Sequence, residues 1–294
     1  MFSIIIPTLN NLKYLQLCIK SLRKHTTLKY EIIPHVNIGN DGTLEYLKNE
    51  SIDYTYTNFN SGICAGMNLA AKKAKFDYIL YAHDDFYFTP QWDIILKKEI
   101  DRIAHNKFYL SGTMMHNGQI PFNCGETFEE FDENKFLKEY KKHNYHDFQG
   151  STWAPHLIHR DVWNKVGGFS EEFFPGTGSD PDLNMKLWNE GIRIFKGINN
   201  FKVYHFGSIV TRKYKGDPEI KTESGSKGGK IFLLKWGISI NFFKSCFLES
   251  GTVYKGELNE PKKNINYYIK FFLCKINYLY IKYIYNYKNK NNLI

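Results

Sequence analysis

The sequence predicts an α/β fold with a mostly parallel central sheet, followed by a basic, aromatic-rich C-terminal extension. Two observations carry this prediction. Short apolar runs alternate with segments of helical periodicity over about the first 85 residues. Charge and aromatic content then change sharply near residue 210, which separates a balanced body from a different tail.

Strand and helix signals alternate four times at the start of the chain. Apolar, β-rich runs predict strands at 2–6, 30–36, 52–57 and 78–82. Apolar spacing of three and four residues predicts helices at 12–22, 43–48 and 61–73. Strands separated by helices pair in parallel through right-handed crossovers, so these repeats predict a parallel sheet.

The pattern is mixed beyond residue 85. Helical patterns occupy 92–103, 127–142 and 180–190, and strand patterns occupy 108–115, 153–159, 192–195 and 201–206. Asp180 can cap the last of these helices, and Gly191 can end it. Gly, Lys and Ser are frequent in 215–230, which predicts a linker. We therefore expect a catalytic domain at 1–214 and an extension at 215–294, with 228–247 packing back on the domain.

The net charge of +9 is confined to the last part of the chain. Residues 1–210 hold 23 Lys and Arg against 24 Asp and Glu, whereas residues 211–294 hold 16 against 6. Residues 262–294 contain seven Lys, nine Tyr or Phe and no acid. A solvated, partly disordered chain end explains this composition best, an anionic membrane surface or a lipid-linked acceptor comes second, and nucleic acid comes last. The lysines do not share one helical face.

Five cysteines are scattered through the chain with no CxxC pair, which argues against a disulfide framework and favours a reducing compartment. The first residues lack the basic and apolar regions of a signal peptide. No uncharged apolar run approaches the roughly 20 residues of a membrane span. We expect a cytoplasmic protein. This expectation includes peripheral attachment at the inner face of the membrane.

Paired carboxylates follow the fourth predicted strand, in the segment His83-Asp84-Asp85. Ligands bind beyond the carboxyl ends of strands in a parallel sheet, and adjacent carboxylates repel each other unless a cation lies beside them. Oxygen ligands suit Mg²⁺ or Mn²⁺, which would bridge a diphosphate. A polar loop in which Asp85 caps the next turn explains the same residues equally well.

Two further residues carry candidate chemistry. Asp180 heads a helix after a glycine-rich stretch, where the helix dipole favours its ionised form, and it suits a general base. Taken alone, a plain helix cap is the better interpretation. His205 ends a predicted strand in the segment 203–208, and a lone histidine is more often structural than a metal ligand.

Taken together and in this order, the motifs resemble glycosyltransferase family 2 of the GT-A fold, which is Rossmann-like. The resemblance covers about residues 2–208. It rests on SIIIPTLN, NFNSGICAGMNLA, HDDFYFTPQWD, VGGFSEEFF, GSDPDLNMKLWNEG and YHFGS. The resemblance implies an inverting transfer of a sugar from a nucleoside-diphosphate sugar to a hydroxyl of a glycan or lipid-linked glycan, in polysaccharide biosynthesis.

The resemblance also assigns roles to residues. Asp180 is the expected base, and the expected ligands of Mn²⁺ or Mg²⁺ are Asp85, His205 and Asp84. The expected donor-binding residues are Pro7, Thr8, Asn10, Asn37, Asp41, Asn60, Gly62, Asn68, His83 and Asp84. The expected acceptor-binding residues are Trp153, Gly178 and Asp182. The family's base-contacting Asp is replaced by Val36 or Asn37, so the nucleobase is left open.

Two other functions compete with this one. A nucleotidyltransferase also combines an α/β sheet with paired carboxylates, but it would usually need a basic phosphate loop, which 8–12 lacks. The competing function that is not an enzyme is a catalytically silent module that binds a sugar or a nucleotide. A dehydrogenase is disfavoured because no GxGxxG follows the first strand.

Overall fold

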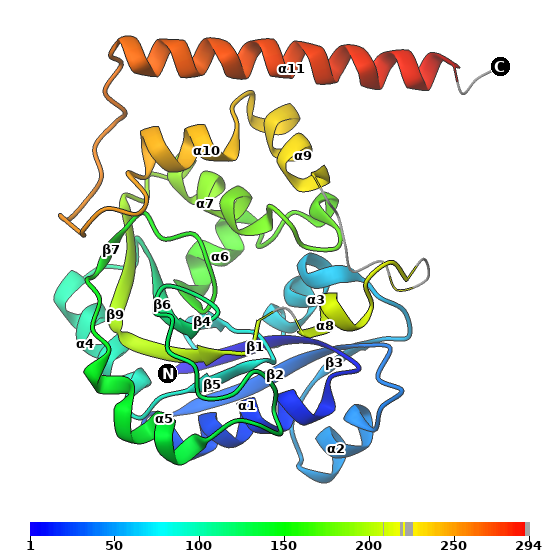
Figure 1. Ribbon diagram of the computed structural model, residues 1–294, viewed down its shortest axis with the longest axis vertical. Helices are drawn as coiled ribbons and strands as arrows, with labels where there is room; N and C mark the ends of the chain where they lie inside the picture. Colours follow the sequence, from blue (N-terminus) through cyan, green and yellow to red (C-terminus); the bar gives the residue numbers. More distant parts are fainter. Residues whose placement is uncertain (208, 218–219, 221–225, 292–294) are drawn as a thin grey trace.

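The sheet at the centre of the molecule contains nine of the strands described (Figure 1). The computed structural model describes residues 1–207, 209–217, 220 and 226–291, with side chains described as far as residue 283. The strand order is β3-β2-β1-β4-β8-β6-β9-β5, and β7 pairs with β9. The strands are β1 (Phe2–Leu9), β2 (Tyr30–Asn37), β3 (Thr55–Thr57), β4 (Tyr78–Tyr81), β5 (Phe86–Phe88), β6 (Phe108–His116), β7 (Phe148–Gln149), β8 (His156–His159) and β9 (Ile194–His205).

The predicted α/β fold is confirmed, and its parallel half is formed by the first four strands. β1 pairs in parallel with β2 and β4, and β2 pairs in parallel with β3. β8 then enters antiparallel between β4 and β6, while β6 and β9 are again parallel. β5 and β7 add antiparallel partners to β9. The second half of the sheet is therefore mixed.

Helices cover both faces of this sheet and extend beyond one end. α3, α6 and α7 lie above β1–β4 in Figure 1, and α1 lies below. The helices are α1 (Leu12–His25), α2 (Thr43–Asn49), α3 (Gly62–Ala71), α4 (Trp92–Ile103), α5 (Glu133–Glu139), α6 (Arg160–Val166), α7 (Ser179–Asn189), α8 (Ile209–Lys213), α9 (Lys227–Trp236), α10 (Ile240–Phe242) and α11 (Ile265–Asn291).

Three element boundaries differ from the sequence prediction. β1 continues through Pro7, because β4 ends opposite Ile5 and Pro7 lies where the strand is paired on one side only. β9 is one long strand in place of the two predicted at 192–195 and 201–206. The charged insert at 127–142 becomes helical only from Glu133.

The main hydrophobic core spans the sheet and the chain beyond α8. Ile4 and Ile5 of β1 are fully buried, and the same cluster includes Phe232 of α9 and Phe242 of α10. The expected packing of 228–247 on the domain is therefore seen. A second cluster, which includes Tyr87, Phe136 and Tyr204, lies under the charged insert.

The expectations about disulfides and membrane spans can be compared with the described residues. All five cysteines are free thiols. Within the described part of the chain, no helix combines the length and apolar character required to cross a bilayer.

Candidate active site

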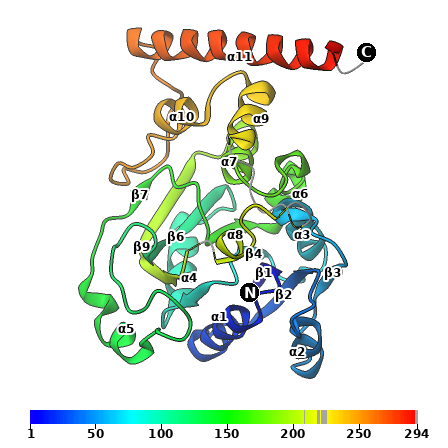
Figure 2. The same ribbon diagram turned by 45° about the vertical axis from the view of Figure 1, so that its right-hand side comes forward.

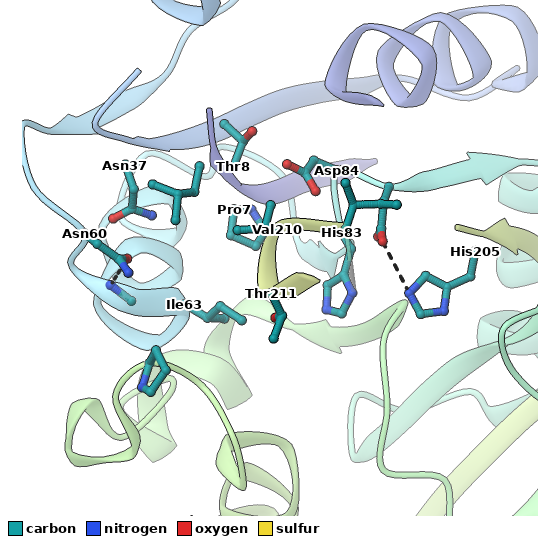
Figure 3. A pocket seen from close by; sticks show the side chains of 15 residues that line it. Pro7, Thr8, Asn37, Asn60, Ile63, His83, Asp84, His205, Val210 and Thr211 are labelled. Atoms are coloured by element: carbon teal, nitrogen blue, oxygen red, sulfur yellow. Dashed lines mark hydrogen bonds and ion pairs between the residues drawn. The ribbon is translucent and has the colours of Figure 1, made fainter. Parts of the chain in front are cut away.

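A pocket of about 240 Å³ opens at the carboxyl end of the parallel strands. It is lined from β1, β2, α3, the turn between β4 and β5, the end of β9, and α8. Seven of the ten expected donor-binding residues line it, namely Pro7, Thr8, Asn37, Asn60, Gly62, His83 and Asp84. Figure 3 labels all of these except Gly62 and shows their side chains around one space. The residues singled out from distant motifs thus lie together.

Three residues at this pocket form a group that could hold a metal ion. One ligand atom from each of His83, Asp85 and His205 lies within 4.8 Å of the other two. The Nε2 atom of His205 lies 3.6 Å from Oδ2 of Asp85, the contact drawn as a dashed line to His205 in Figure 3. Two atoms that each lie about 2.1 Å from one cation can be separated by this distance. The donor set therefore fits a divalent cation.

Hydrogen bonding leaves the histidines ready to act as ligands. Nδ1 of His205 donates to the carbonyl oxygen of Asn117 at 2.7 Å, which leaves the Nε2 lone pair facing Asp85. Burial lowers the pKa of His83 to about 4, so its imidazole is neutral at pH 7. The Tyr81 hydroxyl lies 2.9 Å from His83 Nε2 and orients the ring. Neutral imidazoles are the form that binds metals.

Asp84, which was expected among the metal ligands, is outside this group. Asp84 and Asp85 form the turn between β4 and β5, which is closed by a hydrogen bond from the Phe86 N–H to the His83 carbonyl oxygen. Figure 3 shows Asp84 turned toward Thr8. Burial, and then the charge of Asp85, raises the pKa of Asp84 to about 8. Among the residues described, Asp84 Oδ2, Thr8 Oγ1 and Asn11 Nδ2 are buried without hydrogen-bond partners, which is typical of a polar binding cradle.

Asp180 occupies the first turn of α7, but the N-cap is Gly178, so Asp180 does not take the capping position that the sequence suggested. Its side chain is 28% exposed, yet its Oδ1 atom is buried and has no hydrogen-bond partner among the described residues. Burial raises the pKa of the carboxyl group to about 7. A partly exposed carboxylate whose pKa lies near neutrality is suited to accept a proton.

His156 is the neighbour of Asp180 that the sequence did not reveal. Its Nδ1 atom lies 3.8 Å from Asp180 Oδ1 and 2.9 Å from the Tyr109 hydroxyl. Burial lowers the pKa of His156 to about 3, so the contact with Asp180 is not an ion pair at pH 7. His156 lies on β8, where its apolar neighbours gave it the appearance of an ordinary core residue.

A continuous series of rings joins Asp180 to the metal-ligand group. The Tyr81 ring lies 5.0 Å from the His156 ring, and its hydroxyl contacts His83. The charges of Asp180 and Asp85 both raise the pKa of Tyr81, after the larger effect of burial. Asp180 does not line the pocket with Asp85, but both carboxylates lie near the same tyrosine.

The three expected acceptor-binding residues have different surroundings. Trp153 is partly exposed, donates from Nε1 to the Gly112 carbonyl, and packs edge-on against Phe148. Gly178 precedes α7 with φ of 89°, a left-handed conformation that favours glycine. Asp182 is fully buried.

The carboxylate of Asp182 is occupied by its own chain. Trp236 Nε1 and Ser170 Oγ donate to it at 2.8 and 2.5 Å, and Lys235 Nζ lies 3.0 Å away. In the described structure, Asp182 therefore joins α7 to α9, and its oxygens do not face an acceptor.

Three expected donor-binding residues lie outside the pocket lining. Asn10 accepts a hydrogen bond from the Asn40 backbone N–H, and Asp41 accepts one from that of Leu12. Asn68 forms paired hydrogen bonds with the backbone of Phe169, which fixes the loop leading to α7. These contacts shape the loops around the site.

Several pocket residues were not expected. Pro175 precedes α7, and Ile209, Val210 and Thr211 belong to α8. α8 follows the last motif in the sequence and is short, so periodicity gave no signal for it. Its position over the pocket emerges only from the fold.

Comparisons with known proteins agree with this geometry. The family model described as glycosyl transferase family 2 matches residues 3–163. No significant match was found among curated protein sequences. Among solved structures, residues 1–349 of S. aureus TarS superpose with a TM-score of 0.51 and 16% identity, covering 69% of this chain and 60% of that one.

Further TarS structures give similar values. The same TarS fragment in complex with UDP-GlcNAc has a TM-score of 0.51 and 16% identity over 70% of this chain and 60% of that one. A longer TarS structure has a TM-score of 0.51 and 17% identity over 69% and 36%. The chain thus spans less than two thirds of the length of these neighbours, which show a shared GT-A fold. With the family model covering more than half of its length, the chain belongs to glycosyl transferase family 2, and the enzyme class expected from its motifs is confirmed.

Proposed function

We propose that the protein is a metal-dependent, inverting glycosyltransferase that moves a sugar from a nucleoside-diphosphate sugar to a hydroxyl of a glycan or lipid-linked glycan. The observation that carries the proposal is the meeting of Asp85 and His205 at 3.6 Å beside the pocket, with Asp180 nearby at the start of α7. Family membership and the TarS structures solved with UDP and UDP-GlcNAc support a nucleotide-sugar donor.

The donor occupies the pocket in this proposal. Asn37 and Asn60 offer polar groups at the β2 and α3 side, and Asp84 with Thr8 offers unpartnered oxygens for the hydroxyls of a ribose. Asp85, His205 and His83 would hold the cation. When bound, the cation offsets the negative charge that develops on the leaving nucleotide.

The donor atoms favour one cation. Two imidazoles and one carboxylate form a mixed nitrogen and oxygen set, whereas Mg²⁺ prefers oxygen ligands and retains its waters. We therefore propose Mn²⁺ ahead of Mg²⁺.

Asp180 is the proposed base. Its carboxylate takes the proton of the acceptor hydroxyl as the hydroxyl oxygen bonds to the anomeric carbon and the bond to the diphosphate breaks. A single displacement inverts the anomeric configuration. His156 lies beside Asp180 as a neutral group, with its Nδ1 atom 3.8 Å from the carboxylate and hydrogen-bonded to the Tyr109 hydroxyl.

Fewer of the described residues are available to contact the acceptor than to contact the donor. Trp153 is partly exposed and offers an aromatic face of the kind on which sugars stack. Gly178 forms the left-handed turn at the start of α7, where a Cβ would lie 3.2 Å from the Gly228 backbone. We retain both as proposed acceptor contacts.

The test is release of nucleoside diphosphate from a panel of nucleotide sugars, with Mn²⁺, with Mg²⁺ and with a chelator. We expect one donor to be turned over in Mn²⁺ and none in chelator. Asp180→Asn should remove turnover, while the matched surface variant Asp101→Asn, on the exposed side of α4, should retain it. No release from any donor with either cation would refute the proposal and favour a silent binding module.

A further inference from the structure

α11 has two apolar faces, and only one of them is covered by the described chain. The inner face packs on α9 and α10, where the rings of Tyr267 and Phe271 lie 5.0 and 5.9 Å from that of Phe242. Cys274 is buried on the same face. The outer face consists of Ile265, Tyr268, Ile269, Phe272, Leu273, Ile276, Leu279, Tyr280 and Tyr283, all of them exposed.

The outer face is continuous. At 100° per residue its nine members occupy one arc of about 140° opposite Cys274, and no other residue of 265–283 falls within that arc. Phe272, Leu279 and Tyr283 are 64%, 63% and 71% exposed. An apolar surface of this size needs a partner of its own.

Lysines border this outer face and acids are absent from it. Lys275 and Lys282 lie along one edge, Asn266 and Asn277 lie along the other, and Lys270 lies further round, on the side of Cys274. The lysine chains run along the helix, since Lys275 Nζ lies 4.9 Å from the Phe271 ring. The last acid before α11 is Glu260, whose carboxylate already pairs with Arg193. One edge of the outer face is therefore cationic, and the other is polar and uncharged.

The position of α11 leaves the outer face accessible to a flat surface. In both Figure 1 and Figure 2, α11 lies across one end of the molecule, and the rest of the described chain lies on a single side of it. A planar partner could contact the helix along its length without meeting the sheet.

We propose that the outer face of α11 docks on a membrane surface that carries anionic lipids. Apolar residues would enter the boundary between headgroups and acyl chains, tyrosines would lie at the headgroup level, and the flanking lysines would meet lipid phosphates. A second copy of this chain fits less well, because pairing two outer faces brings cationic edges together without any acid to offset them. The surface lies away from the pocket, so the proposal does not depend on the proposed activity.

The experiment is co-sedimentation of the full chain with vesicles. We expect binding to vesicles of phosphatidylcholine with phosphatidylglycerol, much weaker binding to phosphatidylcholine alone, and release at high salt. The double variant Phe272→Asp and Leu279→Asp should lose binding by tenfold or more. Tyr56→Asp, which changes an exposed aromatic residue on β3, is the matched control and should bind as the unaltered chain does.

Charge is tested separately. Lys275→Glu with Lys282→Glu should weaken binding to anionic vesicles by about fivefold or more for each lysine, the ratio that corresponds to about 1 kcal/mol. Lys48→Glu with Lys98→Glu makes the same change at exposed sites on α2 and α4 and should have little effect. Circular dichroism checks that each variant is folded.

Three outcomes would overturn the proposal. The first is that the unaltered chain fails to sediment with anionic vesicles, or that the outer-face variant binds as well as the control. The second is a dimer in light scattering that the outer-face variant converts to monomer, with no vesicle binding. The third is tight binding of a single-stranded oligonucleotide by α11 with no binding to vesicles.

Discussion

The two sides of the candidate site place carboxylates in opposite surroundings. On the β4 and β9 side, Asp85 lies between two imidazoles and shares a contact of 3.6 Å with His205. On the α7 side, Asp180 has a buried oxygen without a hydrogen bond from the described chain, beside a neutral His156. The first arrangement suits a resident positive charge and the second suits a mobile proton, so environment gives the same chemical group two roles.

The sharpest way to break this comparison is to remove the proton acceptor. Asp180→Asn keeps the shape of the side chain but cannot accept the proton, so we expect turnover to fall by about 10²–10⁴-fold. Isothermal titration of nucleoside diphosphate with Mn²⁺ should show unchanged donor binding. Turnover within a few-fold of the unaltered enzyme would dismiss Asp180 as the base.

The next largest effect is expected on the cation side. Asp85→Asn removes the only charged ligand of the group, so we expect binding of Mn²⁺, followed by its paramagnetic resonance signal, to weaken by about 10²-fold. Asp180→Asn serves as the control and should bind Mn²⁺ normally. If the two variants weakened Mn²⁺ binding equally, the two sides would not have separate roles.

The pH profile tests the α7 side without a mutation. Burial raises the pKa of Asp180 to about 7, so the ionised fraction increases about tenfold per pH unit below 7 and then levels. We expect kcat/KM at fixed free Mn²⁺ to follow this course. A profile already flat at pH 5 would place the pKa of the base near the usual carboxyl value and contradict the burial argument.

The smallest expected effect is on stability. Because the pKa of Asp180 is raised in the folded state above about 3.9 in the unfolded chain, its ionisation favours unfolding as pH rises from about 4 to 7. With allowance for partial exposure of the side chain, Asp180→Asn should be more stable by about 1–2 kcal/mol at pH 8 and nearly equal at pH 4. Urea unfolding at the two pH values measures this difference, and Asp101→Asn should show no comparable dependence.

Much of the site was predictable because strand ends are easily recognised. Asp85, Asp180 and His205 each lie at or next to the end of a strand or helix. The parallel order of β1, β2 and β4 brings such ends together. The family pattern supplied the pairing of Asp85 with His205, which spacing alone could not provide across 120 residues of separation.

Other features depended on contacts that sequence patterns do not record. The choice between His83 and Asp84 as the third member of the metal-ligand group depends on the turn that Asp84 and Asp85 form after β4. His156 meets Asp180 only because β8 lies between β4 and β6. The roles proposed for the donor and acceptor residues, and the division of the chain near residue 214, stay predictions.

The hydrogen bond from Trp236 to Asp182 limits how far the C-terminus of this enzyme can be shortened. Asp182 lies two residues after the proposed base, and both Trp236 and Lys235 reach it from α9. A fragment ending before α9 would leave that carboxylate buried without these partners, a loss of about 3–5 kcal/mol in comparable cases. Minimal versions made for crystallography or screening should therefore end no earlier than Gly237, although the family signature itself stops at residue 163.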